Sequence, residues 1–68
     1  MRSIYDIQQL LKRFGTIIYT GDRVADLQLM EEELRELHHS QLLEQEEYQI
    51  ALFLLKQEIQ KEKEKQRG

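Results

Sequence analysis

Apolar residues recur at helical spacing in two segments of the first half of the chain. In the first segment they lie three or four positions apart, at Ile4, Ile7, Leu11 and Phe14. In the second segment the same spacing joins Val24, Leu27, Met30, Leu34 and Leu37. This period is typical of one buried face of an α-helix. Ser3 and Asp22 are suited to cap the two N-termini, and Gly15 to end the first helix in the left-handed conformation. We therefore predict helices at about residues 4–14 and 22–38.

A third helix is predicted from about residue 41, with Ser40 as its cap, to about residue 62, and it carries two apolar stripes. One stripe comprises Leu43, Ile50, Phe53 and Leu54, and the other, roughly opposite, comprises Tyr48, Leu52, Leu55 and Ile59. A helix that is apolar on two sides is expected to be covered on both. The first stripe suffices to meet the other two helices. We expect the second to meet another copy of the chain around a two-fold axis. The alternative is a wide core that covers both stripes.

The resulting fold is an all-α, compact three-helix bundle in one domain, residues 1–62. The charged residues 63–68 contain no apolar side chain and are expected to form a frayed helical end or a disordered tail. The predicted core takes one stripe from each helix: Ile4, Ile7, Leu11, Phe14, Val24, Leu27, Met30, Leu34, Leu37, Leu43, Ile50 and Leu54.

Between the first two helices, two glycines enclose an apolar segment that favours extended geometry. Ile17, Ile18 and Tyr19 are typical of strands, but a single strand has no partner here. We interpret residues 16–20 as an extended connector packed on the bundle. Because water gains nothing from an apolar, β-branched loop, we expect Ile17 or Ile18 to be buried.

Composition and charge narrow the class of protein. The chain has 68 residues and no cysteine, which excludes disulfides and thiolate metal sites. It has no apolar run of the ~20 residues that span a bilayer, so we expect a cytoplasmic protein that makes no membrane contact. Residues 1–25 carry four basic and two acidic side chains. Residues 26–50 carry one basic and eight acidic side chains, and residues 51–68 carry five basic and three acidic side chains. A polyanion would therefore have to bind the N-terminal end.

Several short segments of the sequence resemble the YqgQ-like family. They are Tyr-Asp-Ile-Gln-Gln-Leu-Leu-Lys at residues 5–12, Phe14-Gly15, Tyr-Thr-Gly-Asp-Arg at residues 19–23, Met30, and Glu-Leu-Arg-Glu-Leu at residues 33–37. The resemblance covers residues 5–59. It implies a compact three-helix fold in the cytoplasm of Gram-positive bacteria. It implies no activity, substrate or catalytic residue.

Basic and aromatic side chains interleave near the N-terminus. Single-stranded nucleic acid needs this combination, with cations for its backbone and rings for its bases. The candidate residues are Arg2, Tyr5, Lys12, Arg13, Tyr19 and Arg23. At the start of the second helix, Arg23 and free backbone N–H groups also suit an anion. For the basic and aromatic residues, the alternative is an ordinary solvated face. For the start of the second helix, the alternative is that Asp22 caps the helix and Arg23 pairs with an acidic neighbour.

The sequence offers little support for catalysis or metal binding. Glu36 and His39 form one Glu-x-x-His unit, but a bundle metal site needs a second such unit. Ser3 and Ser40 are placed as helix caps, with no histidine in a triad relation. We predict no enzyme activity, no cofactor, no metal and no small-molecule substrate. Two hypotheses remain: a protein-interaction module that self-associates as a homodimer, and a single-stranded nucleic-acid (RNA or DNA) binding protein.

Overall fold

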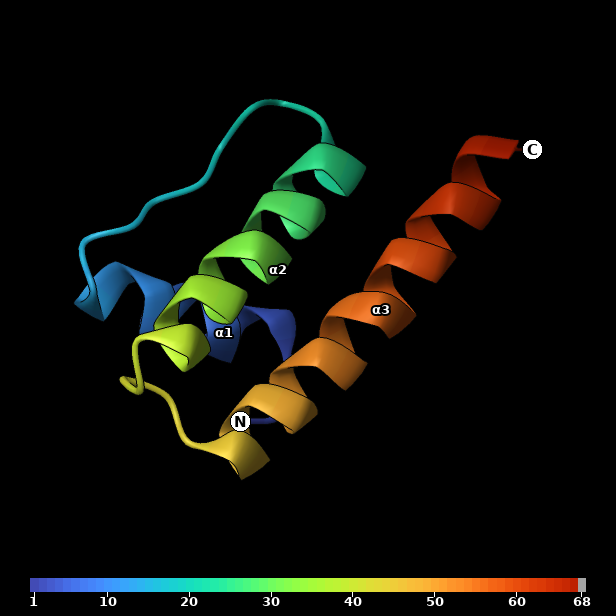
Figure 1. Cartoon of the computed structure of the whole chain (residues 1–68). Coiled ribbons are helices and arrows are strands. Elements are labelled where there is room, and N and C mark those ends of the chain that lie inside the picture. Colours follow the sequence, from blue (N-terminus) through green and yellow to red (C-terminus); the bar gives the residue numbers. More distant parts are fainter. Residues whose placement is uncertain (68) are drawn as a thin grey trace.

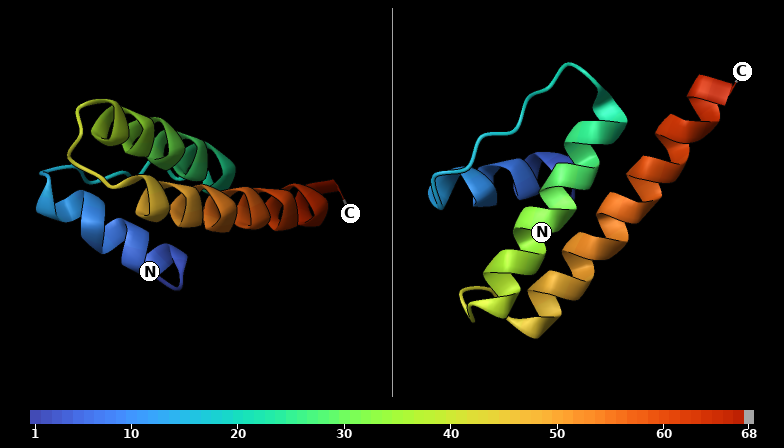
Figure 2. Two further views of the ribbon diagram at one scale, coloured as in Figure 1. Left: turned by 60° about the horizontal axis from the view of Figure 1, so that its bottom comes forward. Right: turned by 45° about the horizontal axis from the view of Figure 1, so that its top comes forward.

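Three helices make up the structure, a computed structural model that describes residues 1–67 (Figure 1). They are α1 (Ile4–Arg13), α2 (Arg23–His39) and α3 (Gln45–Arg67), and no strand occurs in this range. α2 and α3 lie side by side and antiparallel, and they make the most extensive contact. α1 lies against one side of this pair and contacts both of its helices (Figure 2). The predicted all-α three-helix architecture is confirmed.

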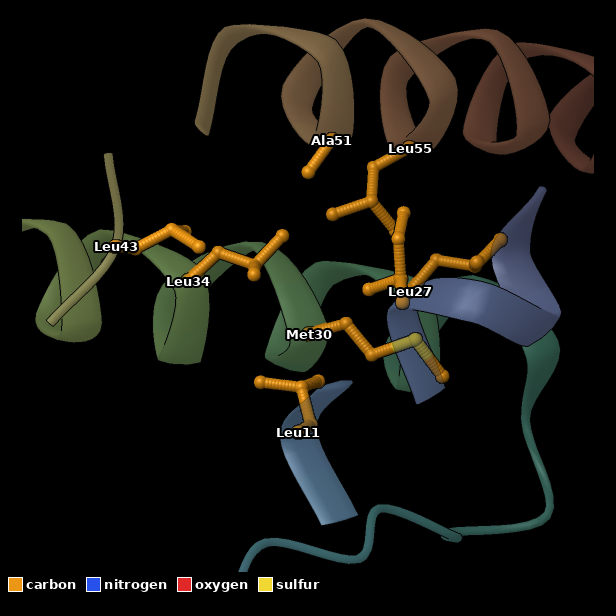
Figure 3. Close-up of a cluster of buried hydrophobic side chains, with 8 residues drawn as sticks. Leu11, Leu27, Met30, Leu34, Leu43, Ala51 and Leu55 are labelled. Carbon is orange, nitrogen blue, oxygen red and sulfur yellow. The ribbon is translucent and has the colours of Figure 1, made fainter. Parts of the chain in front are cut away.

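The core lies where the three helices meet (Figure 3). Its buried side chains come from every helix and from the α2–α3 turn: Ile7, Leu11, Leu27, Met30, Leu34, Leu43, Ala51 and Leu55. Six of them were predicted. Four other predicted core residues, Ile4, Val24, Leu37 and Leu54, are half-buried. Phe14 and Ile50 are exposed, so their assignment to the core is wrong. Phe14 lies beyond the last residue of α1, and Ile50 lies on a face of α3 that is turned outward.

The ends of α1 follow local rules only in part. Ser3 is extended at the N-cap, but its hydroxyl makes no capping bond, so that prediction is wrong. Instead the Asp6 carboxylate accepts a hydrogen bond from the Arg2 backbone N–H at 2.9 Å. At the other end Gly15 has φ +85°, as predicted. The Thr16 N–H donates to the Leu11 carbonyl at 2.9 Å, which completes a left-handed helix stop.

α3 begins four residues later than predicted, because Gln41 takes a left-handed conformation with φ +62°. Its N–H donates to the His38 carbonyl at 3.0 Å, and the Leu42 N–H donates to the Leu37 carbonyl at 2.9 Å. These two bonds end α2, so Ser40 caps the C-terminus of α2 and not the start of α3. At its other end α3 continues through Arg67. Residues 63–67 of the predicted tail are therefore helical, and Gly68 lies outside the described residues.

Gln41→Gly should stabilise the protein by about 0.5–1 kcal/mol, because glycine adopts positive φ without the steric cost that a Cβ atom brings. The measurement is the free energy of unfolding in urea. Gln41→Ala is the matched control, since it shortens the side chain and keeps the strain. A glycine variant no more stable than the alanine variant would show that Gln41 is not strained.

No helix within residues 1–67 is both long enough and apolar enough to cross a membrane.

Candidate functional site

The stripe that the sequence assigned to self-association lies inside the single chain. Leu55 is fully buried, and Tyr48 and Ile59 pack against the core. Leu52 is half-buried. The expectation that this stripe is left for a second copy of the chain is therefore wrong. The physical reason is Ala51, a small buried residue on the same face, three positions after Tyr48, four before Leu55 and eight before Ile59. Its small side chain lets α3 approach α2 on this side.

Tyr48 has a further partner that keeps it inward. Its ring stacks on the His38 ring, with centroids 4.2 Å apart and planes 8° from parallel. The His38 Nε2 atom lies 2.6 Å from the Gln45 Oε1 atom. These contacts join the last turn of α2 to the first turn of α3. They hold the two helices in the rotation that turns Ile50 and Phe53 outward.

The opposite face of α3 is exposed and carries two large apolar side chains. Phe53 is 63% exposed and Ile50 is 48% exposed. We define the outer face of α3 as the exposed residues Glu46, Ile50, Phe53, Gln57 and Lys61. At the helical rotation of about 100° per residue these five lie within about 80° of arc. The outer face thus has an apolar centre, an acidic end and a basic end.

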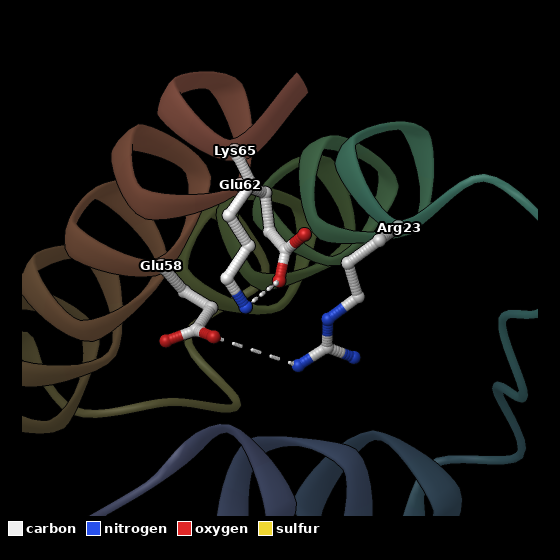
Figure 4. Close-up of polar contacts among 4 residues, drawn as sticks. All are labelled: Arg23, Glu58, Glu62 and Lys65. Atoms are coloured by element: carbon white, nitrogen blue, oxygen red, sulfur yellow. Dashed lines mark ion pairs between the residues drawn. The ribbon is translucent and has the colours of Figure 1, made fainter. Parts of the chain in front are cut away.

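Ion pairs line both edges of the α2–α3 contact. On one edge the Glu31 carboxylate lies 3.4 Å from the Lys56 Nζ atom and 3.7 Å from the Arg35 guanidinium. On the other edge the Arg23 guanidinium lies 4.0 Å from the Glu58 carboxylate (Figure 4). These side chains are partly exposed, so each pair contributes little to stability. By contrast, Glu46 and Lys61 of the outer face pair with no other side chain that the structure describes.

The six basic and aromatic candidates are all exposed, and five of them border three neighbouring hollows. Arg2 and Arg13 border one hollow together with the acids Asp6 and Glu47. Lys12 borders a second hollow, of about 210 Å³, between α1 and the connector. Tyr19 and Arg23 border a third hollow, further along the connector. Tyr5 lines none of the three.

The N-terminus of α2 is already occupied by the chain's own groups. The Asp22 carboxylate accepts the Val24 N–H at 3.0 Å and the Ala25 N–H at 3.3 Å, so its predicted capping role is confirmed. Arg23 lies beside Glu58, as the alternative to an anion site expected. Both observations count against an anion site at this helix end.

A buried carboxylate that the sequence reasoning missed holds the connector. Asp26 is only 8% exposed, and its Oδ1 atom accepts both the Thr20 N–H, at 2.7 Å, and the Thr20 hydroxyl, at 2.6 Å. The available signal was its position one turn before Met30, at the edge of the apolar stripe of α2. The bonds from Asp26 fix the far end of the connector.

The connector itself is half packed and half exposed. Ile18 is half-buried and packs against the core, so the prediction that Ile17 or Ile18 would be buried is confirmed only in part, by Ile18. Ile17 is 79% exposed and Tyr19 is 86% exposed. An anchored segment that presents two large apolar side chains to water is a second candidate surface.

Metal ligands do not gather in the described part of the chain. Glu36 and His39 are both exposed on α2. Within residues 1–67 no group of three or more His, Cys, Asp or Glu side chains could hold a metal ion.

Comparison with known proteins finds one family. The model of the family described as YqgQ-like matches residues 1–61. The chain is also 41% identical over 63 residues to "Uncharacterized protein YqgQ" of Bacillus subtilis (strain 168). That match covers 93% of this chain and 89% of the relative.

Proposed function

Because the chain belongs to the YqgQ-like family, a membership that brings no activity with it, we propose a function from its surface: a non-enzymatic interaction module of the bacterial cytoplasm that self-associates through α3. The observation that carries the proposal is the exposed pair Ile50 and Phe53 on one face of a 23-residue helix. The surface differs from the stripe predicted from the sequence, but the helix and the kind of partner are the same.

A second copy complements the outer face in charge. If two α3 helices meet antiparallel around a two-fold axis between Phe53 and Leu54, Glu46 of one copy lies opposite Lys61 of the other. The same axis repeats that pair with the copies exchanged. Each Ile50 then lies opposite a Gln57, and the two Phe53 rings meet near the axis. Glu46 and Lys61 are free for this role, since neither forms an ion pair with another described side chain.

The energetics favour a weak dimer. Fully burying an apolar side chain is worth about 1.5–3 kcal/mol. The exposed fractions of Ile50 and Phe53 add up to about one whole apolar side chain per copy. Two copies therefore gain about 3–6 kcal/mol, against an association cost of at least about 4 kcal/mol. The dimer thus depends on the Glu46–Lys61 pairs, and it should form at high protein concentration and low salt.

Phe53→Glu should raise the dimer Kd by at least about tenfold, because it places a charge at the centre of the apolar contact. The measurement is sedimentation equilibrium over a range of protein concentrations. Tyr5→Glu is the matched control, since Tyr5 on α1 is 65% exposed, close to the 63% of Phe53. Both variants should melt like the parent.

The charges test the register of the dimer. Glu46→Lys and Lys61→Glu should each weaken association, and the double variant should restore it, because the two changes exchange the signs across the axis. A parent chain that sediments as a clean monomer at the highest concentration tested would refute self-association. Failure of the double variant to restore it would refute the antiparallel register.

Single-stranded nucleic-acid binding is the second candidate function. In its favour, all six basic and aromatic candidates are exposed. Tyr5 and Lys12, seven residues apart, lie close together around the helix on the exposed side of α1. We rank it second because Arg2 and Arg13 share their hollow with Asp6 and Glu47.

Lys12→Glu combined with Arg13→Glu should abolish any binding of a mixed-sequence oligonucleotide at low salt, because it reverses two of the few cations. The measurement is an NMR titration with ¹⁵N-labelled protein, repeated at increasing salt. If the resonances of Tyr5, Lys12, Arg13, Tyr19 and Arg23 do not shift for the parent at low salt, this candidate is removed.

A further inference from the structure

The connector between α1 and α2 is an extended segment fixed at both ends. Figure 1 shows it as a long trace that joins the end of α1 to the start of α2. At the first end the Thr16 N–H donates to the Leu11 carbonyl at 2.9 Å. At the second end the Thr20 N–H donates to the Asp26 carboxylate at 2.7 Å. The five residues 16–20 are therefore held in place, although they belong to no sheet.

The two anchoring bonds define which backbone groups remain open. In an extended strand, successive N–H and C=O groups point to alternate sides. Thr16 and Thr20 both direct their N–H groups toward their own chain. The groups of Ile17 and Tyr19 therefore point to the opposite edge. Within residues 1–67 neither residue makes a backbone hydrogen bond, and both are largely exposed.

An open edge of this composition is a template for a further strand. Thr-Ile-Ile-Tyr-Thr consists only of residues that favour strands, and the segment has no lysine or proline to block pairing. Edges of this kind bind extended peptides through main-chain hydrogen bonds, with side chains setting the specificity. Ile17 and Tyr19 lie two residues apart, so their side chains project from one face and can pack on alternate residues of an incoming strand.

The charges around the edge select the partner. Lys12 lies close to the first anchor and borders the hollow beside Ile17 and Ile18, and it forms no ion pair with another described side chain. The nearby acids are engaged, since Asp22 caps α2 and Asp26 holds Thr20. The hollow of about 210 Å³ beside Ile17 and Ile18, bordered by Lys12, offers room for an apolar side chain.

We propose that the Ile17–Tyr19 edge binds an extended segment of another protein, with apolar residues at alternate positions and an acidic residue at the end that lies beside Lys12. The segment adds as a strand, receiving and donating main-chain hydrogen bonds at Ile17 and Tyr19. This surface is separate from the outer face of α3, so the inference does not depend on self-association.

The test uses the full chain, labelled with ¹⁵N, and the synthetic peptide acetyl-Glu-Val-Thr-Val-Glu-amide at low salt. Saturating peptide should slow amide exchange at Ile17 and Tyr19 by roughly tenfold or more, the effect expected for a formed hydrogen bond, with little change at Thr16 and Thr20. The counterpart with lysine at both ends should bind at least about tenfold more weakly, because one of its lysines lies beside Lys12 in either strand direction.

Matched variants separate the backbone from the side chain. Ile17→Pro deletes one outward N–H group and should weaken peptide binding by about tenfold. Ile17→Val keeps the N–H and the β-branched shape and should bind like the parent. Because the Ile17 side chain is largely exposed, both variants should give the same circular dichroism spectrum and melting curve as the parent.

Three outcomes would overturn the proposal. The first is no slowing of exchange at Ile17 and Tyr19 at saturating peptide, or shifts confined to α3. The second is equal affinity for the acidic and basic peptides. The third is slowing that appears as the protein concentration rises without peptide, which would assign the edge to a second copy of the chain.

Discussion

Leu34→Ala should lower the free energy of unfolding by about 2–5 kcal/mol, because it removes three carbons from a fully buried site and leaves a cavity. Leu34 lies in the second half of α2, among core side chains of the α2–α3 turn and α3 (Figure 3). A chain of 68 residues has a total stability of about 3–10 kcal/mol at the usual value per residue. The substitution therefore removes a large share of it.

The measurement is urea unfolding followed by circular dichroism, with parent and variant at equal concentration. Leu29→Ala makes the same chemical change on the opposite side of α2, where the side chain is 40% exposed. It should cost less than about 1 kcal/mol, since much of the leucine is already in water. A Leu34 variant that unfolds at the parent's urea concentration would contradict the core described above.

Leu55→Ala should cost about 2–5 kcal/mol, whereas Ile50→Ala should cost less than about 1 kcal/mol. Leu55 is fully buried on the inward face of α3, and Ile50 is about half exposed on the outer face. Leu52→Glu should also reduce stability, because it places a charge at a half-buried position. The readout is again the free energy of unfolding.

The comparison of Leu55 with Ile50 tests the rotation of α3 about its own axis. A larger loss for Ile50→Ala than for Leu55→Ala would mean that α3 presents its other stripe to the core. In that case the outer face defined here would be buried, and the proposed dimer would lose its surface. The ratio of the two losses therefore checks the fold and the premise of the proposed function together.

The helices themselves could be predicted from local signals. The spacing of Leu27, Met30 and Leu34 requires one buried face whatever the partner, and all three are buried. Asp22 and Gly15 act within a few residues of their own position, so their roles at helix ends were also predictable. The start of α3 was missed because Gln41, which is not a usual left-handed residue, takes positive φ there.

The candidate site was predictable only in outline. Hydrophobic spacing identified two stripes on α3, but both carry large apolar residues, and spacing alone cannot say which one faces the bundle. Ala51 supplied the missing information, since a small residue in line with Leu55 marks a close helix contact. The hydrogen bonds between Thr20 and Asp26 could not be predicted from the sequence either, because they join residues whose proximity depends on the path of the connector.

By itself, then, the sequence determined the number and type of the elements, the cap of α2, the stop of α1 and the presence of an apolar surface on α3. These properties depend on contacts within a few residues. The tertiary structure alone decided that Leu55 faces inward, that Ile50 and Phe53 face outward, and that the basic side chains fall into separate hollows. Those outcomes depend on how closely one helix approaches another, which is a property of packed volumes and not of spacing along the chain.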